Sequence, residues 1–319
     1  MKELGQEYLE LLKAKDGQQF DEVNGACLDI EPLSMGKDTE GVECNTHQLH
    51  EVVLKIVLEM DRVCRKNNID YALAFGSALG IHNYKGFIPW DDDADFVIKY
   101  EDIDRFIEAC KKDLSDDFVL ECWETDKRYN VLIPTMKLRY KHSYVKEFNH
   151  NHLPNKCKNG DTIFVDIVAM VDVPDDKLEH KKVLRYAKRR VVPYWFIDSV
   201  LRLQPHFLKK QLKKYERKMF EKYHGKTNSV AQTFIVPWQD YNMPLSAISC
   251  PRDVCYPFRE YEFEGHKLYS FNNVPEFCKI RYGERCFRKF IDGKWVDPFP
   301  KERRNMGHIK EFNLRRYKK

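Results

Sequence analysis

The sequence predicts an α+β fold, in which a mixed β-sheet is backed by helices and a C-terminal half elaborates the sheet core. A continuous apolar stripe at helical spacing runs from Leu49 to Cys64, which is typical of a helix packed on a sheet. The apolar segment 71–75 predicts a buried strand, and the alternation of charged and apolar residues over 93–98 predicts a second strand. These three segments place a helix beside neighbouring strands.

The strand at 71–75 leads into a Gly76-Ser77 turn and then a short helix. A turn of this kind that enters a helix offers free backbone N–H groups and a hydroxyl. Helix N-termini with such groups are ready sites for phosphate. Gly76 and Ser77 are therefore candidates for binding the phosphates of a substrate.

Paired acids follow the turn. Asp93 and Asp95 are two residues apart on the predicted strand 93–98, so their carboxylates share one face. Asp166 lies within the apolar run 163–171, where an unpaired carboxylate would be costly to bury. If the three acids face one another, Mg²⁺ or Mn²⁺ is the cation that their oxygens prefer.

The segment 91–95 contains two further acids, Asp91 and Asp92, which are expected in different places. Asp91 keeps the same alternation but precedes the expected strand, so we expect it beside the cation ligands. Asp92 points the other way and is expected on the surface or in a turn.

Together, Gly76-Ser77, the string Ile88-Pro-Trp-Asp-Asp-Asp93, Asp93-x-Asp95 and Asp166 resemble the signature of the LicD family. That family lies in the nucleotidyltransferase superfamily, alongside fukutin and fukutin-related protein. The resemblance implies a nucleotidyltransferase-like core in which Asp93, Asp95 and Asp166 are catalytic and hold the metal. It also implies transfer of a phospho-alcohol group, such as phosphocholine, from a CDP-linked donor to a sugar hydroxyl of a cell-surface glycan or its precursor, as in lipopolysaccharide or teichoic acid biosynthesis.

The resemblance extends to the donor site. It implies that Gly76, Ser77 and Lys137 contact the donor, and a loose match near the C-terminus adds Arg303 and His308. Lys85 is a further candidate. A second, equally open interpretation makes Lys85 a solvated lysine and places Lys137 and Arg139 as solvated cations on an edge strand. The match also includes a Pro-led helix that ends in Arg281-Tyr-Gly283, whereas Asn83 stands where relatives commonly carry Arg.

Two other functions share these residues. Nucleotidyl transfer, in which NMP moves from NTP to a small molecule, needs the same three acids. A non-catalytic glycan- or membrane-binding protein could use the same scaffold, but it would have little use for clustered acids.

The composition argues against a nucleic-acid-binding protein and against a membrane-spanning one. Charged residues make up 33% and apolar ones 43%, and the net charge of +4 is too small to indicate nucleic acid as a partner. No apolar run approaches the roughly 18 residues that span a bilayer, and the N-terminal sequence lacks a signal peptide's apolar core, so a cytoplasmic protein is expected. Basic helices at 175–190 and 207–223 predict either solvated faces or contact with the inner face of the membrane and a lipid-linked acceptor.

The ten cysteines are expected to be free thiols. Cys250, Cys255, Cys278 and Cys286 could in principle bind zinc, but their spacing favours buried structural thiols.

The chain divides into an N-terminal helix and arm (1–44), a catalytic core (45–190), and a helical and short-strand acceptor region packed on the core (191–319). Asn45 is expected to cap the first core helix, and Asp172 to cap the helix near 175. The other expected elements are helices at 101–113 and 274–283 and strands at 118–122, 131–140, 234–237, 261–263 and 266–271.

Overall fold

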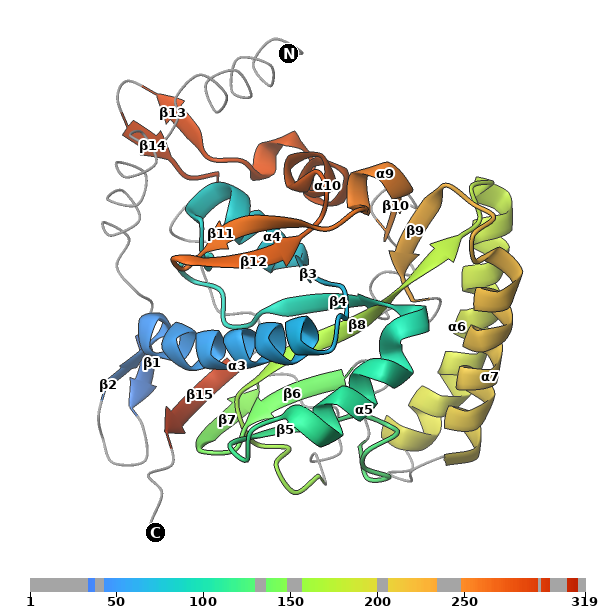
Figure 1. The fold of residues 1–319 in the computed structure, drawn as a ribbon, viewed down its shortest axis with the longest axis horizontal. Coiled ribbons are helices and arrows are strands. Elements are labelled where there is room, and N and C mark those ends of the chain that lie inside the picture. Colours follow the sequence, from blue (N-terminus) through green and yellow to red (C-terminus); the bar gives the residue numbers. More distant parts are fainter. Residues whose placement is uncertain are drawn as a thin grey trace.

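The computed structural model describes residues 34–37, 43–129, 136–147, 157–199, 206–233, 248–291, 294–298 and 309–314. In those ranges the chain forms a mixed sheet of nine strands with seven helices around it (Figure 1), which confirms the predicted α+β class. The sheet strands are β3 (Tyr71–Ala74), β4 (Asp95–Lys99), β5 (Phe118–Glu121), β6 (Met136–Tyr140), β8 (Phe164–Val173), β9 (Ser229–Gln232), β10 (Ser249–Pro251), β11 (Arg259–Phe263) and β12 (His266–Ser270). The helices are α3 (Thr46–Lys66), α4 (Phe75–Tyr84), α5 (Ile103–Asp113), α6 (Lys177–Ser199), α7 (His206–Tyr223), α9 (Arg252–Cys255) and α10 (Val274–Tyr282).

The ten-residue strand β8 is the centre of the sheet. Its first half pairs with β4 on one side and β6 on the other, and its second half pairs with β9. The order along the sheet is β10-β9-β8-β4-β3-β12-β11, with β6 and β5 branching from β8. Only β4–β8 and β12–β3 among these pairs are parallel, so the sheet is mixed.

Helix α3 forms as the sequence predicts. Asn45 caps it, because its side chain accepts the Gln48 N–H at 3.1 Å while the Gln48 side chain accepts the Asn45 N–H at 3.0 Å. The apolar stripe that begins at Leu49 is buried, and it packs on β6, β8 and α5. Burying this stripe gives the helix its main stabilisation, since an isolated helix gains little from propensity alone.

The C-terminal part of the chain contributes strands to the same sheet. β12 lies beside β3, with Ser270 opposite Leu73 and the Ser270 hydroxyl donating to the Leu73 carbonyl at 2.7 Å. β9 extends the sheet on the far side of β8. Three pairs of strands lie outside the sheet: β1 (Ser34–Lys37) with β2 (Glu43–Asn45), β7 (Ser143–Glu147) with β15 (Ile309–Leu314), and β13 (Lys289–Ile291) with β14 (Lys294–Val296).

Several expected element boundaries were wrong. Helix α6 does not end near Arg190 but continues through Pro193 to Ser199. Asp172 does not cap it: this carboxylate lies inside β8, is buried, forms an ion pair with Arg252, and accepts the Gly225 N–H at 2.7 Å. The strand expected at 234–237, the segment 131–135 and the helix expected at 1–15 lie outside the described residues.

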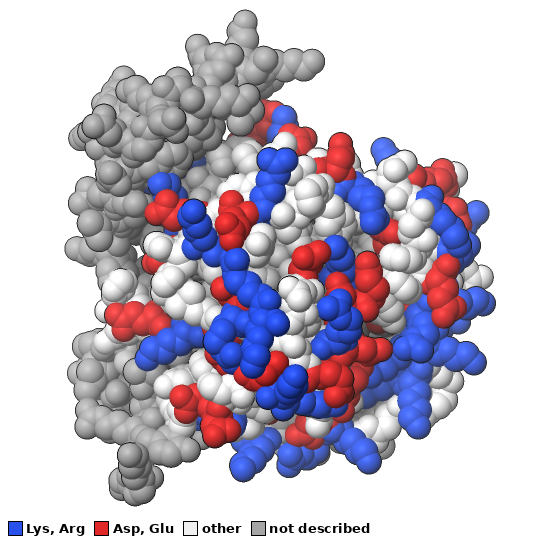
Figure 2. Space-filling view, viewed as in Figure 1, with Lys and Arg blue, Asp and Glu red and all other residues white. Residues whose placement is uncertain are grey.

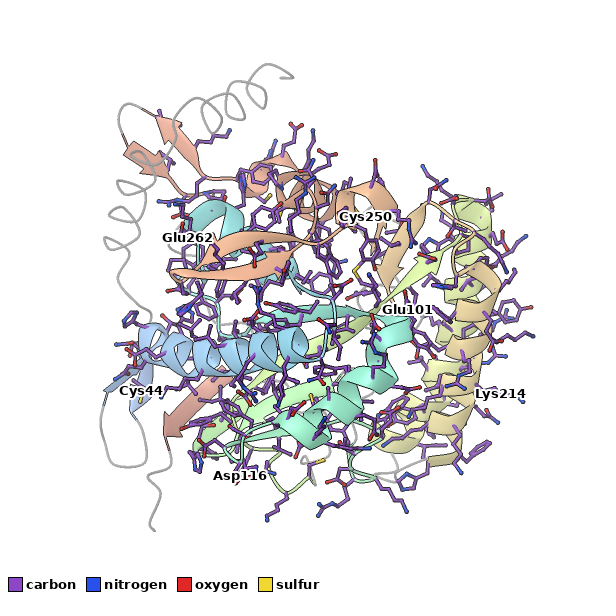
Figure 3. All side chains as sticks on the ribbon, in the orientation of Figure 1. Cys44, Glu101, Asp116, Lys214, Cys250 and Glu262 are labelled. Atoms are coloured by element: carbon purple, nitrogen blue, oxygen red, sulfur yellow. The ribbon has the colours of Figure 1, made fainter. Side chains whose placement is uncertain are left out.

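The cysteines at 250, 255, 278 and 286 are buried, as the structural interpretation predicted, and Cys250 lies in β10 below α9 (Figure 3). None of the helices in the described part of the chain is both long and apolar enough to span a bilayer. Acidic and basic side chains alternate over most of the visible surface, but Lys and Arg gather at the edge formed by α6 and α7 (Figure 2).

Candidate active site

Three carboxylates meet where β4 begins. One oxygen from each of Asp93, Asp95 and Asp166 lies within 4.8 Å of the other two. The register explains this, because Asp95 stands directly opposite Asp166 in the parallel pair β4–β8 and Asp93 lies two residues before Asp95. All three side chains are half-buried and reachable from solvent. Three carboxylate oxygens so close together could hold a divalent metal ion.

A lysine on the neighbouring strand β6 lies beside the three acids. Lys137 on β6 stands opposite Asp166 on β8, and its Nζ lies 3.0 Å from the Asp166 carboxylate oxygens. Its side chain is almost buried and lies over the Phe164 ring. The alternative that Lys137 and Arg139 are solvated cations on an edge strand is therefore wrong, because β6 lies between β5 and β8.

Arg139 has no exposed surface at all and forms an ion pair with Glu121 on β5, with 2.7 Å between Nε and Oε2. Arg139 therefore joins β6 to β5 and has a structural role.

The first turn of α4 faces the acids. Phe75 adopts a left-handed backbone conformation (φ 48°), which turns the chain sharply from β3 into the helix. The Ser77 hydroxyl accepts the backbone N–H of Asp95 at 3.0 Å and so fixes β4 to α4. A side chain at Gly76 would place its Cβ 2.8 Å from the Asp91 carboxylate, so a larger residue there would push this acid away from the positive end of the helix.

The loop that carries the acidic run is held by α3. The Thr46 hydroxyl donates to the Pro89 carbonyl at 2.9 Å, and His50 Nε2 donates to the Asp91 carbonyl at 2.8 Å. The His50 ring stacks on Phe87, and burial lowers its pKa to about 4, so the ring is neutral at physiological pH. These contacts fix the path of the loop before it enters β4.

Asp92 corrects the expectation of a surface or turn position. It is fully buried, and its carboxylate accepts the backbone N–H of Ile309 at the start of β15. Asp91, Asp92 and Asp93 also bring carboxylate oxygens within 4.8 Å of one another, so Asp91 lies beside the proposed ligands as expected. The acidic run therefore serves two purposes: Asp92 anchors the loop inward while Asp93 and Asp95 face the site.

Residues 68–206 match the model of the LicD/FKTN/FKRP nucleotidyltransferase domain. Residues 68–206 are thus similar to a nucleotidyltransferase domain of this family. Over 250 residues, covering 73% of this chain and 88% of the relative, it is also 24% identical to the lipopolysaccharide cholinephosphotransferase LicD of Haemophilus influenzae. The family resemblance inferred from the sequence is thus confirmed, and the chain is distantly related to a cholinephosphotransferase.

Not every residue that the resemblance suggested lies at the acids of this LicD-type domain. Lys85 ends α4 and pairs with Glu262 at 3.2 Å. A ten-residue helix is about 15 Å long, so Lys85 lies at the opposite end of α4 from Gly76 and Ser77. Arg303 and His308 lie outside the described residues.

Asn83, where the resemblance leads us to expect Arg, is a buried structural residue. Its Nδ2 donates to the Cys286 carbonyl at 2.9 Å, and its Oδ1 accepts the Arg288 N–H at 3.2 Å. The side chain therefore holds the segment after α10 against α4.

Arg281 was not among the predicted site residues of the LicD-type domain. It lies near the end of α10, and its guanidinium is 5.3 Å from the centre of the Phe75 ring, at the first turn of α4. The signal that could have found it is its place directly before Tyr282-Gly283, because a Pro-led helix ending in Tyr-Gly was part of the resemblance.

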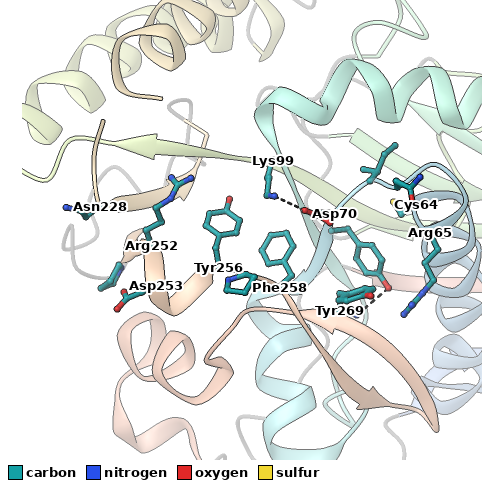
Figure 4. A pocket seen from close by; sticks show the side chains of 15 residues that line it. Cys64, Arg65, Asp70, Lys99, Asn228, Arg252, Asp253, Tyr256, Phe258 and Tyr269 are labelled. Carbon is teal, nitrogen blue, oxygen red and sulfur yellow. Dashed lines mark hydrogen bonds and ion pairs between the residues drawn. The ribbon is translucent and has the colours of Figure 1, made fainter. Parts of the chain in front are cut away.

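A cavity of about 1090 Å³, lined by described residues, lies away from the three acids. It lies at the other end of β3 and β4, around Asp70 and Lys99, with walls that include Tyr256, Phe258 and Tyr269 (Figure 4). Its three cations have carboxylate partners: Lys99 pairs with Asp70, Arg65 with Asp61 and Glu260, and Arg252 with Asp172. At the cavity, Tyr71 stands opposite Ile98, and at the acids Ala74 stands opposite Asp95. Three residues of β3, about 10 Å, therefore separate the cavity from the acids.

Proposed function

We propose that this protein transfers a phospho-alcohol group, such as phosphocholine, from a CDP-linked donor to a sugar hydroxyl of a cell-surface glycan or its precursor. The observation that carries the proposal is the meeting of Asp93, Asp95 and Asp166 within 4.8 Å in a LicD-type domain. A non-catalytic binding module would gain nothing from such mutual repulsion. The name of the Haemophilus influenzae relative supports choline as the alcohol and lipopolysaccharide as the acceptor.

In this proposal Asp93, Asp95 and Asp166 hold Mg²⁺ or Mn²⁺. When bound, the cation neutralises negative charge on the donor phosphates and favours ionisation of the attacking hydroxyl. The oxygen of the sugar hydroxyl forms a bond to the phosphorus of the phospho-alcohol, and the bond from that phosphorus to the CMP oxygen breaks. Asp166 accepts the hydroxyl proton, and CMP leaves.

The phosphates of the donor need positive partners. The backbone N–H groups around Gly76 and Ser77 and the ammonium of Lys137 are assigned this role, since both adjoin the three acids. Arg281 is added, because its guanidinium lies over Phe75 where α4 begins. Lys85 is assigned to structure instead, because of its pairing with Glu262.

The acceptor is assigned to the 191–319 region. Arg303 and His308 stay assigned to the donor through the family resemblance. We place the reaction on the cytoplasmic side of the membrane, with a lipid-linked glycan among the acceptors. Nucleotidyl transfer from an NTP remains the alternative enzyme activity, because it would use the same acids.

The test is a donor panel with Mg²⁺, comparing CDP-choline, CDP-ribitol, CDP-glycerol and the four NTPs by ³¹P NMR. Release of CMP from a CDP-alcohol supports the proposal, and pyrophosphate from an NTP without CMP from any CDP donor replaces it with nucleotidyl transfer. The Asp95→Asn variant should be inactive, whereas Asp116→Asn, at an exposed turn between α5 and β5, should match the unaltered protein. Absence of turnover with every donor and acceptor glycan would leave a binding protein.

A further inference from the structure

Positive charge is concentrated on the helical hairpin α6–α7. These two helices hold fourteen Lys and Arg residues and four Asp and Glu residues, a net charge of +10. The whole chain carries only +4, so the rest of it is negative, at −6. The gathering of Lys and Arg at the edge formed by these helices is visible in Figure 2. A separation of this size creates a strong local field that the overall charge conceals.

The outward side of the hairpin contains a groove of about 660 Å³ between the two helices. Five cations and one acid line it: Lys182, Arg190, Lys214, Lys218, Lys222 and Glu179. Glu179 is paired with Lys222 at 2.8 Å. Lys214 lies at the outer edge of α7 (Figure 3), and the Arg190 guanidinium lies 4.7 Å from the centre of the Tyr215 ring. The groove therefore offers cations above an aromatic wall, which suits a phosphate attached to an apolar group.

The same helices expose large apolar side chains. Five of the eight large hydrophobic residues that are exposed in the described part of the chain lie here: Leu178, Tyr186, Val192, Phe196 and Phe207. Phe207 and Leu178 have 63% and 67% of their surface exposed. The opposite side of α6 is buried through Ala187 and Val191. Cations alone would be explained by a solvated face, but exposed Phe and Leu among cations are typical of a helix that lies on a membrane.

We propose that the outward face of the α6–α7 hairpin docks on an anionic phospholipid bilayer, with headgroup phosphates in the groove and the exposed apolar side chains in the interface. The proposal does not depend on the identity of the donor. Its geometry suits a lipid-linked acceptor, because α6 follows β8 directly and β8 also carries Asp166. Seven residues of strand, roughly 23 Å, separate Asp166 from the end of β8.

The test is co-sedimentation of the full chain with vesicles of phosphatidylcholine alone or mixed equally with phosphatidylglycerol. We expect binding to the mixed vesicles, loss of that binding at high salt, and none to phosphatidylcholine. The triple variant Lys182→Glu, Lys214→Glu, Lys218→Glu should bind at least roughly 100-fold more weakly, because each cation removed near the surface weakens binding about fivefold. The matched triple Lys111→Glu, Lys112→Glu, Lys267→Glu changes the net charge equally on exposed residues elsewhere and should bind as the unaltered protein does.

Two further measurements make the proposal falsifiable. Phe196→Ser with Phe207→Ser should weaken vesicle binding without changing the charge, and circular dichroism should show that every variant is folded. An equal loss in both charge triples would reduce the effect to net charge and overturn the proposal. Binding to single-stranded RNA that exceeds binding to mixed vesicles at the same salt would also overturn it, as would no binding to either vesicle.

Discussion

Replacing Asp95 by Asn should stabilise the metal-free protein. Two unit charges 4.8 Å apart repel by about 0.9 kcal/mol in water and about 3.5 kcal/mol at an effective dielectric constant of 20. Asp95 has two such neighbours, Asp93 and Asp166, within 4.8 Å. The acids are half-buried, and Lys137 offsets part of the repulsion through Asp166, so the lower end of the range applies. We expect the free energy of unfolding to rise by about 1–2 kcal/mol.

The assay is thermal unfolding with chelator, and then with Mg²⁺ or Mn²⁺. A ligand at 100 times its Kd stabilises the native state by about 2.7 kcal/mol, so the unaltered protein should gain with metal and Asp95→Asn should not. The ranking of the two proteins should therefore reverse when metal is added. The control Asp92→Ala should be less stable by about 1–3 kcal/mol with and without metal, because the Ile309 N–H loses its buried acceptor.

The reasoning would be refuted by an Asp95→Asn protein that is less stable than the unaltered one in chelator yet is stabilised by metal to the same extent. That result would mean that Asp95 contributes to the fold and not to a cation site. Near-normal turnover by Asp95→Asn would remove its catalytic assignment as well.

The remaining predictions concern the surrounding charges. Lys137→Met should lower the free energy of unfolding by about 1–3 kcal/mol in chelator, since it leaves Asp166 without its cation, and the loss should shrink when Mg²⁺ is added; an unchanged melting temperature would count against the pairing. Arg139→Met should cost about 3–5 kcal/mol in denaturant titrations because Glu121 is left buried and unpaired, and adding Glu121→Leu should recover most of that cost. Burial raises the pKa of Glu216 to about 8 from 4.5, so the unfolded state loses its proton first and the free energy of unfolding should fall between pH 4.5 and 8; Glu216→Gln should flatten this dependence, and a parallel pH curve would contradict it. Chelators should abolish turnover while circular dichroism stays unchanged, and metal analysis should find no stoichiometric zinc.

The spacing of apolar residues was enough to predict helices and strands that bury one face. The α3 stripe and its Asn45 cap follow from the spacing of apolar residues and from one polar residue at the helix start. The meeting of Asp95 and Asp166 was also predicted, because Asp166 interrupts an otherwise apolar strand, where an unpaired carboxylate would be costly to bury.

Partners distant in the sequence could not be predicted. Asp92 looked like a surface residue because its acceptor role depends on Ile309, which lies 217 residues further along the chain. Lys137 left two interpretations open because periodicity identifies the face of a strand but not whether another strand lies beside it. Asp172 was predicted to be a helix cap because the residues that hold it inside β8, Arg252 and Gly225, also follow much later in the chain.

The bond between Asp92 and Ile309 has a consequence for how the protein is made. The matched domain, 68–206, already contains all three acids, yet β12 and β15 are synthesised after it. On the ribosome, the acidic loop lacks its inward anchor and β3 lacks its second neighbour, β12, until these late strands emerge. A nascent or prematurely terminated chain would therefore have its acidic loop held by the contacts with α3 alone, without the bond from Ile309 to Asp92. The acidic loop would have all of its described anchors only after translation has passed residue 309.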